Sequence, residues 1–274
     1  MTAIEPFDSL ARCAPGRWSH AGVTVERDGG PLRFARTPDG GLLVRHGLQP
    51  KELGERLVAD ITARVGSIGG RQDEFESVMV GLVLSTVPDP LDAWATYYRN
   101  SMADLLSGTA DFAPIHQRAQ ELVTGSVLDM GSCFGFFPIR LAMAGVPVTA
   151  TDIHLGTTRM IDAVVPRLGV DLPTITCTAA DVPLPDRSVD TVTALHLLEH
   201  VDPQIGRAVV AEAIRLARRR VVIAVPFENE ATACHGHVRI FDLGALDALG
   251  RDTGLPFRTS EYHGGWLILE TADH

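Results

Sequence analysis

The stretch Val127-Leu128-Asp129-Met130-Gly131-Ser132-Cys133-Phe134-Gly135 decides the fold that this sequence predicts. The apolar run from Ser126 to Met130 predicts a buried strand. A turn with two glycines follows, and an apolar helix is expected over Phe136–Ala144. Glycine lets the backbone turn tightly and approach a ligand, so this order of elements is typical of ligand-binding α/β sheets.

Apolar strands and helices alternate on both sides of this stretch, from about Pro114 to the C-terminus. This alternation predicts an α/β, Rossmann-like, doubly wound and mostly parallel sheet of seven strands. Two strands separated by His263-Gly264-Gly265 predict an antiparallel pair at one edge. Besides Ser126–Met130, the expected strands are Val146–Thr151, Thr174–Cys177, Thr191–Leu195, Arg220–Pro226, Phe257–Tyr262 and Trp266–Glu270. The remaining expected helices are Ile115–Thr124, Thr157–Leu168, Pro203–Arg218 and Leu243–Thr253.

The N-terminal part of the chain has another pattern, which predicts an α+β extension. The first 20 residues show no clear period and are expected to be partly irregular. Short strands joined by glycine-containing turns are expected at Val23–Arg27, Leu32–Arg36 and Leu42–Arg45. Three helices follow, and the third begins at Asp89-Pro90, a favourable N-cap with proline in the first turn. We therefore expect two domains, an extension at residues 1–110 that binds an acceptor or forms a lid, and the sheet domain at residues 111–274.

Composition narrows the class of protein. The 274 residues carry a formal net charge of −10, which argues against a nucleic-acid partner because such proteins present basic surfaces. No run of about 18 apolar residues suggests a membrane span, and no signal peptide is recognisable, so a cytoplasmic protein is expected. The cysteines contain no C-x-x-C pair and predict no zinc framework; they are Cys13, Cys133, Cys177 and Cys234.

Acidic residues follow three successive predicted strands. Asp129 ends the first, Asp152 ends the second, and Asp181 comes shortly after the third. Ligands of open α/β sheets bind at the carboxyl ends of the strands. Asp152 is suited to accept hydrogen bonds from ribose hydroxyls, and Asp181 to bond an adenine amino group. The candidate cofactor-binding residues are Asp129, Gly131, Ser132, Cys133, Gly135, Asp152, Ile153, Ala180, Asp181, Val182 and His196.

These positions resemble the class I S-adenosylmethionine (SAM)-dependent methyltransferases, and in particular the subgroup with a Leu-Glu-His run, here Leu198-Glu199-His200. The first motif of that family has an acidic residue and three spaced glycines, which Asp129, Gly131 and Gly135 match while Cys133 replaces the middle glycine. The resemblance implies SAM as the cofactor of residues 111–274. An NAD-binding domain is the alternative, but it would favour G-x-G-x-x-G and would leave Asp181 unexplained.

Histidines gather where the acceptor of the methyl group is expected. A hydroxyl acceptor needs a general base, most often histidine or a carboxylate. His237 and His235 are the first candidates because they lie in the loop after the fifth predicted strand, and His200 and Glu199 are further candidates for catalysis or for orienting their neighbours. Each histidine alone is also compatible with a structural role. Their spacing matches no closed zinc pattern, so no metal site is expected.

Several longer sequence segments are similar to the mycofactocin oligosaccharide methyltransferase family. This resemblance implies O-methylation of a glucose hydroxyl in the oligosaccharide tail of a redox cofactor, with Trp94 and Trp266 either stacked on a sugar or buried. The alternatives are a methyltransferase acting on oxygen or nitrogen of another natural product, and a non-catalytic module with the same fold. The segments are Asp129–Pro138, His196–His200, Val225–Glu228, Gly236–Arg239, His263–Trp266 and Trp94–Tyr98.

Overall fold

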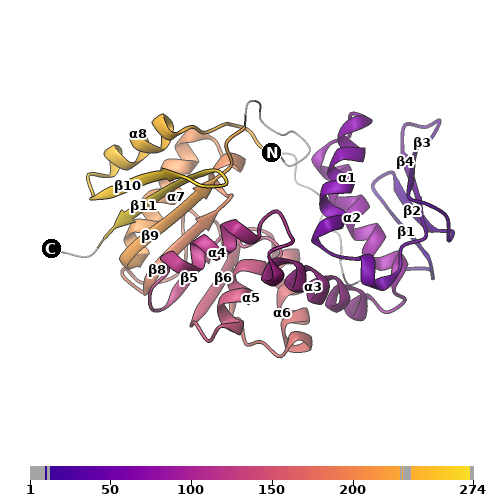
Figure 1. The fold of residues 1–274 in the computed structure, drawn as a ribbon, viewed down its shortest axis with the longest axis horizontal. Coiled ribbons are helices and arrows are strands. Elements are labelled where there is room, and N and C mark those ends of the chain that lie inside the picture. The colour runs from indigo at the N-terminus through magenta and orange to yellow at the C-terminus, as the bar shows by residue number, and fades with distance from the viewer. Residues whose placement is uncertain (1–9, 11–12, 229, 231–235, 272–274) are drawn as a thin grey trace. The chain divides into compact units, whose positions relative to one another are not determined.

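A computed structural model describes residues 10, 13–228, 230 and 236–271, and the chain divides into two compact units. The first unit ends at Asp111 and also includes Gly236, and the second begins at Phe112. Figure 1 shows the course of the chain. Among the residues described, no helix is both long enough and apolar enough to cross a membrane.

The N-terminal unit contains a four-stranded sheet in the order β1-β2-β4-β3. Strand β2 lies parallel to β4, whereas β1 pairs antiparallel with β2, and β3 pairs antiparallel with β4. Strand β1 lies within the first 20 residues, where the sequence predicted no particular element, because its four residues are too few to show a period and depend on pairing with β2. The strands are β1 (Arg17–His20), β2 (Val23–Arg27), β3 (Arg33–Arg36) and β4 (Leu42–His46).

Helix α2 packs on this sheet, and α1 and α3 pack against α2. Gly81 of α2 permits close packing, because a β-carbon there would lie 2.3 Å from a methyl group of Val25. The Asp89 side chain accepts a hydrogen bond from the amide of Asp92 and caps α3, as the sequence predicts. Trp94 on α3 is 1% exposed and belongs to the core. The helices are η1 (Pro50–Glu52), α1 (Glu55–Ser67), α2 (Gln72–Thr86) and α3 (Pro90–Ser107).

The C-terminal unit contains a seven-stranded sheet in the order β10-β11-β9-β8-β5-β6-β7. Five neighbouring strands of this sheet, β9, β8, β5, β6 and β7, are parallel. Strand β11 is antiparallel to both of its neighbours, β9 and β10. This topology confirms the predicted fold class. The strands are β5 (Val127–Met130), β6 (Val148–Asp152), β7 (Thr174–Thr176), β8 (Val189–Leu195), β9 (Ala217–Val225), β10 (Phe257–Glu261) and β11 (Gly265–Glu270).

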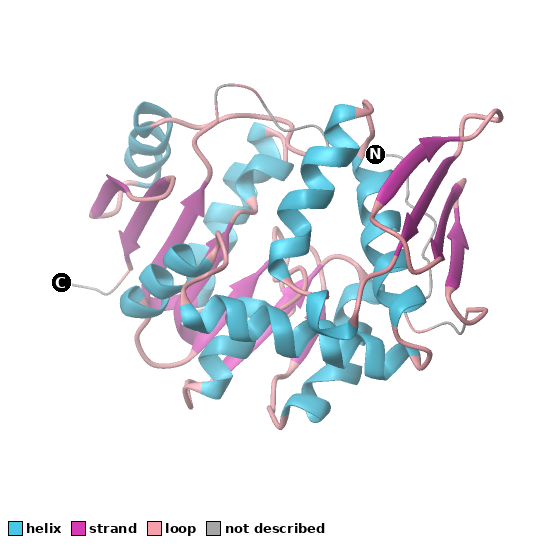
Figure 2. Ribbon diagram, turned by 45° about the vertical axis from the view of Figure 1, so that its right-hand side comes forward, coloured by secondary structure: helices cyan, strands magenta, loops and turns pink. Residues whose placement is uncertain are grey.

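Helices cover both faces of the seven-stranded sheet (Figure 2). The helix predicted to reach Arg218 ends at Leu216, because Ala217 already pairs with Val189 of β8 and the arginines that follow belong to β9. Arg220 of that strand pairs with Glu270 of β11. The helices are α4 (Ala113–Leu122), α5 (Phe136–Met143), α6 (Leu155–Leu168), η2 (Leu198–His200), α7 (Pro203–Leu216) and α8 (Leu243–Thr253).

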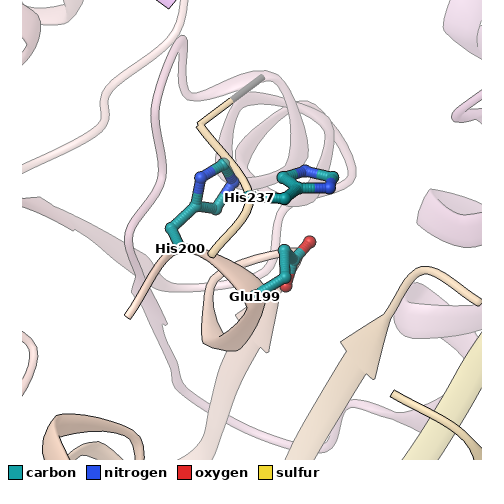
Figure 3. Close-up of side chains that lie close together, drawn as sticks. All are labelled: Glu199, His200 and His237. Carbon is teal, nitrogen blue, oxygen red and sulfur yellow. The ribbon is translucent and has the colours of Figure 1, made fainter. Parts of the chain in front are cut away.

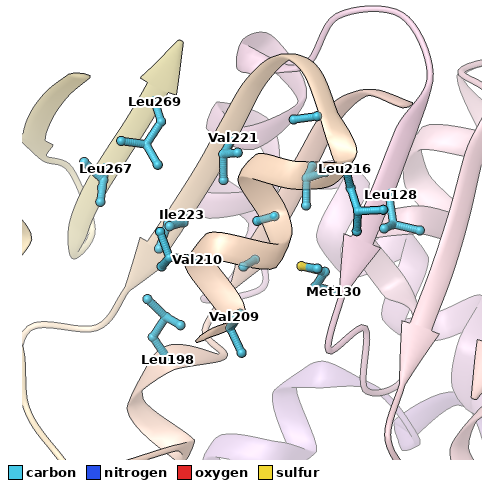
Figure 4. Close-up of a cluster of buried hydrophobic side chains, with 14 of the residues drawn as sticks. Leu128, Met130, Leu198, Val209, Val210, Leu216, Val221, Ile223, Leu267 and Leu269 are labelled. Carbon is cyan, nitrogen blue, oxygen red and sulfur yellow. The ribbon is translucent and has the colours of Figure 1, made fainter. Parts of the chain in front are cut away.

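A cluster of buried apolar side chains fills the space between α7 and the sheet (Figure 4). Leu128 and Met130 contribute from β5, Ile223 from β9, and Val209 from α7. Leu198 of η2 belongs to the same cluster and is fully buried. Burial of these side chains favours one arrangement of the strands, so the core fixes where the carboxyl ends of β5, β8 and β9 lie.

Candidate active site

The carboxyl ends of the parallel strands form the edge at which the predicted site residues meet. Strand β5 has β6 on one side and β8 on the other, so the strand order reverses at this point. Ligands of open α/β sheets bind at such a switch point. Asp129 lies near the end of β5, Asp152 ends β6, and η2 follows β8.

The turn after β5 has left-handed backbone at three positions. The φ angles are 69° at Gly131, 49° at Cys133 and 73° at Gly135. Cys133 therefore adopts the conformation for which the related motif uses glycine, at a cost of about 1–2 kcal/mol for a residue with a β-carbon. A β-carbon at Gly131 would lie 2.7 Å from a methyl group of Leu197, so a larger residue there would have to displace that side chain.

Hydrogen bonds from Asp129 hold this turn to the sheet. One carboxylate oxygen accepts from the Thr193 hydroxyl of β8 at 2.5 Å, and the other accepts from the Ser132 hydroxyl at 2.7 Å. The amide of Ser132 donates to the carbonyl of Thr151 at 2.8 Å. Burial raises the pKa of Asp129 to about 6, although the two hydroxyl donors act in the opposite direction. Asp129 thus connects β5, the turn and β8.

Asp152 presents a carboxylate that the backbone orients. The amide of His154 donates to Oδ1 at 2.9 Å, and the amide of Cys133 donates to Oδ2 at 3.0 Å. Each oxygen retains a further acceptor site, so the pair can receive two ribose hydroxyls. Ile153, the next residue, is 55% exposed and offers an apolar surface beside the carboxylate. Both features fit a nucleoside.

The residues after β7 divide into an exposed and a buried part. The side chain of Asp181 is exposed, and its amide donates to the Thr178 carbonyl at 3.1 Å. Ala180 is half-buried. The Val182 side chain lies in the core, and its amide donates to Glu212 at 2.7 Å. Asp181 is therefore the residue of this group whose side chain is open to a ligand.

The segment after β8 brings His196 and Glu199 together. His196 also has a left-handed backbone, with φ of 53°, and its amide donates to the Ala224 carbonyl of β9 at 2.8 Å. Its Nδ1 lies 3.2 Å from Oε1 of Glu199, and its ring packs against Phe112 at 4.9 Å between centroids. Glu199 is fully buried. These contacts fix the Leu-Glu-His run at the edge of the sheet.

Histidines from two segments meet beyond this run (Figure 3). The rings of His200 and His237 lie 4.9 Å apart between centroids, and Nδ1 of His237 lies 2.7 Å from Oε2 of Glu228. The amide of Val238 donates to the Glu199 carbonyl at 2.9 Å and holds the two segments together. His235, the other first candidate, lies outside the described residues.

Two features of this cluster were absent from the sequence predictions. The ligand atoms of Glu199, His200 and His237 all lie within 4.8 Å of one another, although no metal site was expected. Glu228 was not predicted as a partner of His237, and its position just beyond the end of β9 is the signal that could have suggested it.

Comparisons with known proteins agree with this geometry. Residues 128–225 match a family model described as a methyltransferase domain, and no curated protein matches the chain. A putative SAM-dependent methyltransferase from Methanococcus maripaludis superposes with a TM-score of 0.51 at 13% identity, over 66% of this chain and 94% of that one. The PH0226 protein of Pyrococcus horikoshii superposes with a TM-score of 0.50 at 15% identity, over 65% and 98%.

The match of residues 128–225 to a methyltransferase domain makes the chain a methyltransferase, and the acidic residues at the strand ends are suited to SAM as its cofactor. The residues present fit that cofactor. Gly131 provides the left-handed turn, both oxygens of Asp152 retain an acceptor site, and Ile153 supplies an exposed apolar surface. The match to a methyltransferase domain favours a methyltransferase over the NAD-binding alternative.

Replacing Asp152 by asparagine is expected to weaken SAM binding by about tenfold to a hundredfold, because a hydrogen bond to a charged group contributes roughly 1.5–3 kcal/mol. Calorimetric titration with SAM measures the change. Asp171→Asn is the matched control, since Asp171 is exposed between α6 and β7 and is expected to leave the affinity unaltered. Equal affinities for the two variants would contradict the assignment of Asp152.

Asp129 is expected to make the free energy of unfolding depend on pH. Its pKa is about 6 in the folded protein and near 3.8 in an unfolded chain, so the folded state holds the proton more tightly. The contribution of Asp129 to stability is therefore lost as pH rises from about 4 to 6, by about 3 kcal/mol. Urea unfolding of wild type and Asp129→Asn across this range measures it, and a constant difference between them would contradict the shift.

Proposed function

We propose that this methyltransferase acts on a sugar hydroxyl, namely a glucose of the mycofactocin oligosaccharide, with a histidine as general base. The observation that carries the proposal is the His237–Glu228 pair, in which Nδ1 lies 2.7 Å from a carboxylate oxygen. A carboxylate at Nδ1 fixes the imidazole tautomer and directs Nε2 as the proton acceptor, an arrangement known from other histidine bases.

The chemistry of transfer to oxygen explains why this pair matters. SAM, when bound, supplies a methyl group on a positively charged sulfur. A sugar hydroxyl is a weak nucleophile, so Nε2 of His237 would take its proton as the oxygen receives the methyl group and the methyl–sulfur bond breaks to leave a neutral thioether. Glu228 stabilises the imidazolium that forms. Asp152 and the turn at Gly131 hold the cofactor, so the two reactants are aligned for an in-line displacement.

The other candidates have supporting places in this proposal. The ring of His200 packs edge-on against His237 and limits its rotation. Glu199 is buried below the two histidines and holds the second segment through its backbone. His235 remains a candidate base on its sequence position alone.

A sugar is proposed as the acceptor on two grounds. They are the sequence segments similar to the mycofactocin-associated family and the surface near the site. Both tryptophans considered for stacking are 1% exposed, so neither can meet a sugar. Tyr262 in the β10–β11 hairpin is 46% exposed and follows the same edge of the sheet, because Gly265 pairs with Val225 at the end of β9. An exposed aromatic ring of this kind suits the apolar face of a hexose.

Incubation with isotopically labelled SAM and an extract of mycofactocins with glucose tails tests the acceptor. Mass spectrometry is expected to find the label on a glucose hydroxyl. Label on an amine, or on another natural product and never on the sugar, would replace this proposal with a different methyltransferase activity. Binding of SAM without transfer to any compound would instead favour the non-catalytic module.

His237→Ala is expected to lower kcat by about 10²–10⁴-fold, the usual contribution of a general base. Glu228→Gln is expected to lower kcat less, because glutamine can still orient the ring but cannot stabilise the imidazolium. Affinity for SAM is expected to stay at the wild-type value in both variants, which shows that the fold is intact. Full turnover by both His237→Ala and His235→Ala would exclude a base in this loop.

A further inference from the structure

Glu199 is a buried carboxylate that lacks a hydrogen-bond donor. Its side chain is 0% exposed, and neither oxygen has a hydrogen-bond partner in the described part of the chain. His196 lies 3.2 Å away from Oε1 without meeting hydrogen-bond geometry. Burying an unpaired carboxylate costs several kcal/mol. No described cation donates a hydrogen bond to this carboxylate, so a further positive charge beside it would be stabilising.

The positive charge of Arg239 acts on Glu199, but the guanidinium of Arg239 donates its hydrogen bond to another group. Its Nε donates to the carbonyl of Leu198 at 2.8 Å, and the group lies over the ring of Phe241 at 4.4 Å. Gly206 of α7 gives the guanidinium its room, because a β-carbon there would lie 2.5 Å from an Arg239 nitrogen. Arg239 therefore contributes to the local field without a hydrogen bond to the Glu199 carboxylate.

The side chains around Glu199 have the composition of a metal site. Ligand atoms of Glu199, His200 and His237 lie within 4.8 Å of one another, and Figure 3 shows the two rings above the carboxylate. Ligands held about 2.0–2.2 Å from a zinc ion lie roughly 3–4 Å apart, so small side-chain rotations would close the set. Glu228 at Nδ1 of His237 is the outer carboxylate that metal-binding histidines commonly have, with Nε2 directed to the ion.

We propose that Glu199, His200 and His237 bind one transition-metal ion of the Zn²⁺ type. Two imidazole nitrogens and one carboxylate suit Zn²⁺, whereas Mg²⁺ prefers a set of oxygens. The ion supplies the positive charge that Glu199 lacks. The site itself follows from the geometry, and only its effect on catalysis rests on the proposed function. Nε2 of His237 cannot hold an ion and accept a proton at once, so bound Zn²⁺ inhibits methyl transfer.

Titration of the full chain, first treated with a chelator, tests the site. Calorimetry is expected to show one Zn²⁺ per chain and at least hundredfold weaker binding of Mg²⁺. Glu199→Gln and His200→Gln are each expected to weaken Zn²⁺ binding by at least tenfold, and Glu228→Gln by about 10–100-fold. His20→Gln, on β1 of the N-terminal unit, is the matched control and is expected to bind as wild type does. Co²⁺ absorption in the visible range reports the coordination independently of activity.

The outcomes separate this site from the proposed function. Absence of Zn²⁺ binding by protein that still binds SAM would overturn the metal site and leave the methyltransferase proposal standing. Unchanged Zn²⁺ binding by the Glu199 and His200 variants would overturn it as well, because the ion would then sit elsewhere. Inhibition that a chelator reverses supports the competition at His237, and stimulation by Zn²⁺ would contradict it. Zn²⁺ binding without transfer to any hydroxyl would leave the metal site in place and remove the proposed acceptor.

Discussion

The rest of the site depends on the hydrogen bonds that the Asp129 carboxylate accepts. It receives hydrogen bonds from Thr193 on β8 and from Ser132 in the turn, so that three segments meet at one buried side chain. The turn, once held, places the amide of Cys133 against Asp152. The orientation of the Asp152 carboxylate is therefore a consequence of packing around Asp129. Burial of Asp129 explains the raised pKa of Asp129.

The sequence predicted the C-terminal fold well because its strands are apolar and its helices have a clear period. Each strand of the seven-stranded sheet lies where an apolar run was recognised, and the acidic residues at the strand ends indicated the cofactor before any geometry was known. Strand β1 was missed because four residues carry no period. The end of α7 was misplaced because the arginines from Arg218 onward have no pattern that separates a helix end from a strand.

The acceptor side was only partly predictable, since it depends on contacts between distant segments. Histidines near the strand ends could be recognised as candidates. Their pairing could not, because the contact of His237 with Glu228 and its approach to Glu199 depend on the path of the chain after β9. Spacing rules for zinc sites describe ligands within one local motif, so they do not recognise a cluster built from η2 and a later loop.

The close contact between Gly131 and Leu197 couples the two halves of the site mechanically. A β-carbon at Gly131 would meet Leu197 at 2.7 Å, and Leu197 directly precedes the turn that carries Glu199 and His200. A larger residue at Gly131 would have to displace the Leu197 side chain, so the cofactor turn and the acceptor segment share one packing contact. The residue types that fit in the cofactor turn are thereby limited by packing against the segment that carries Glu199 and His200.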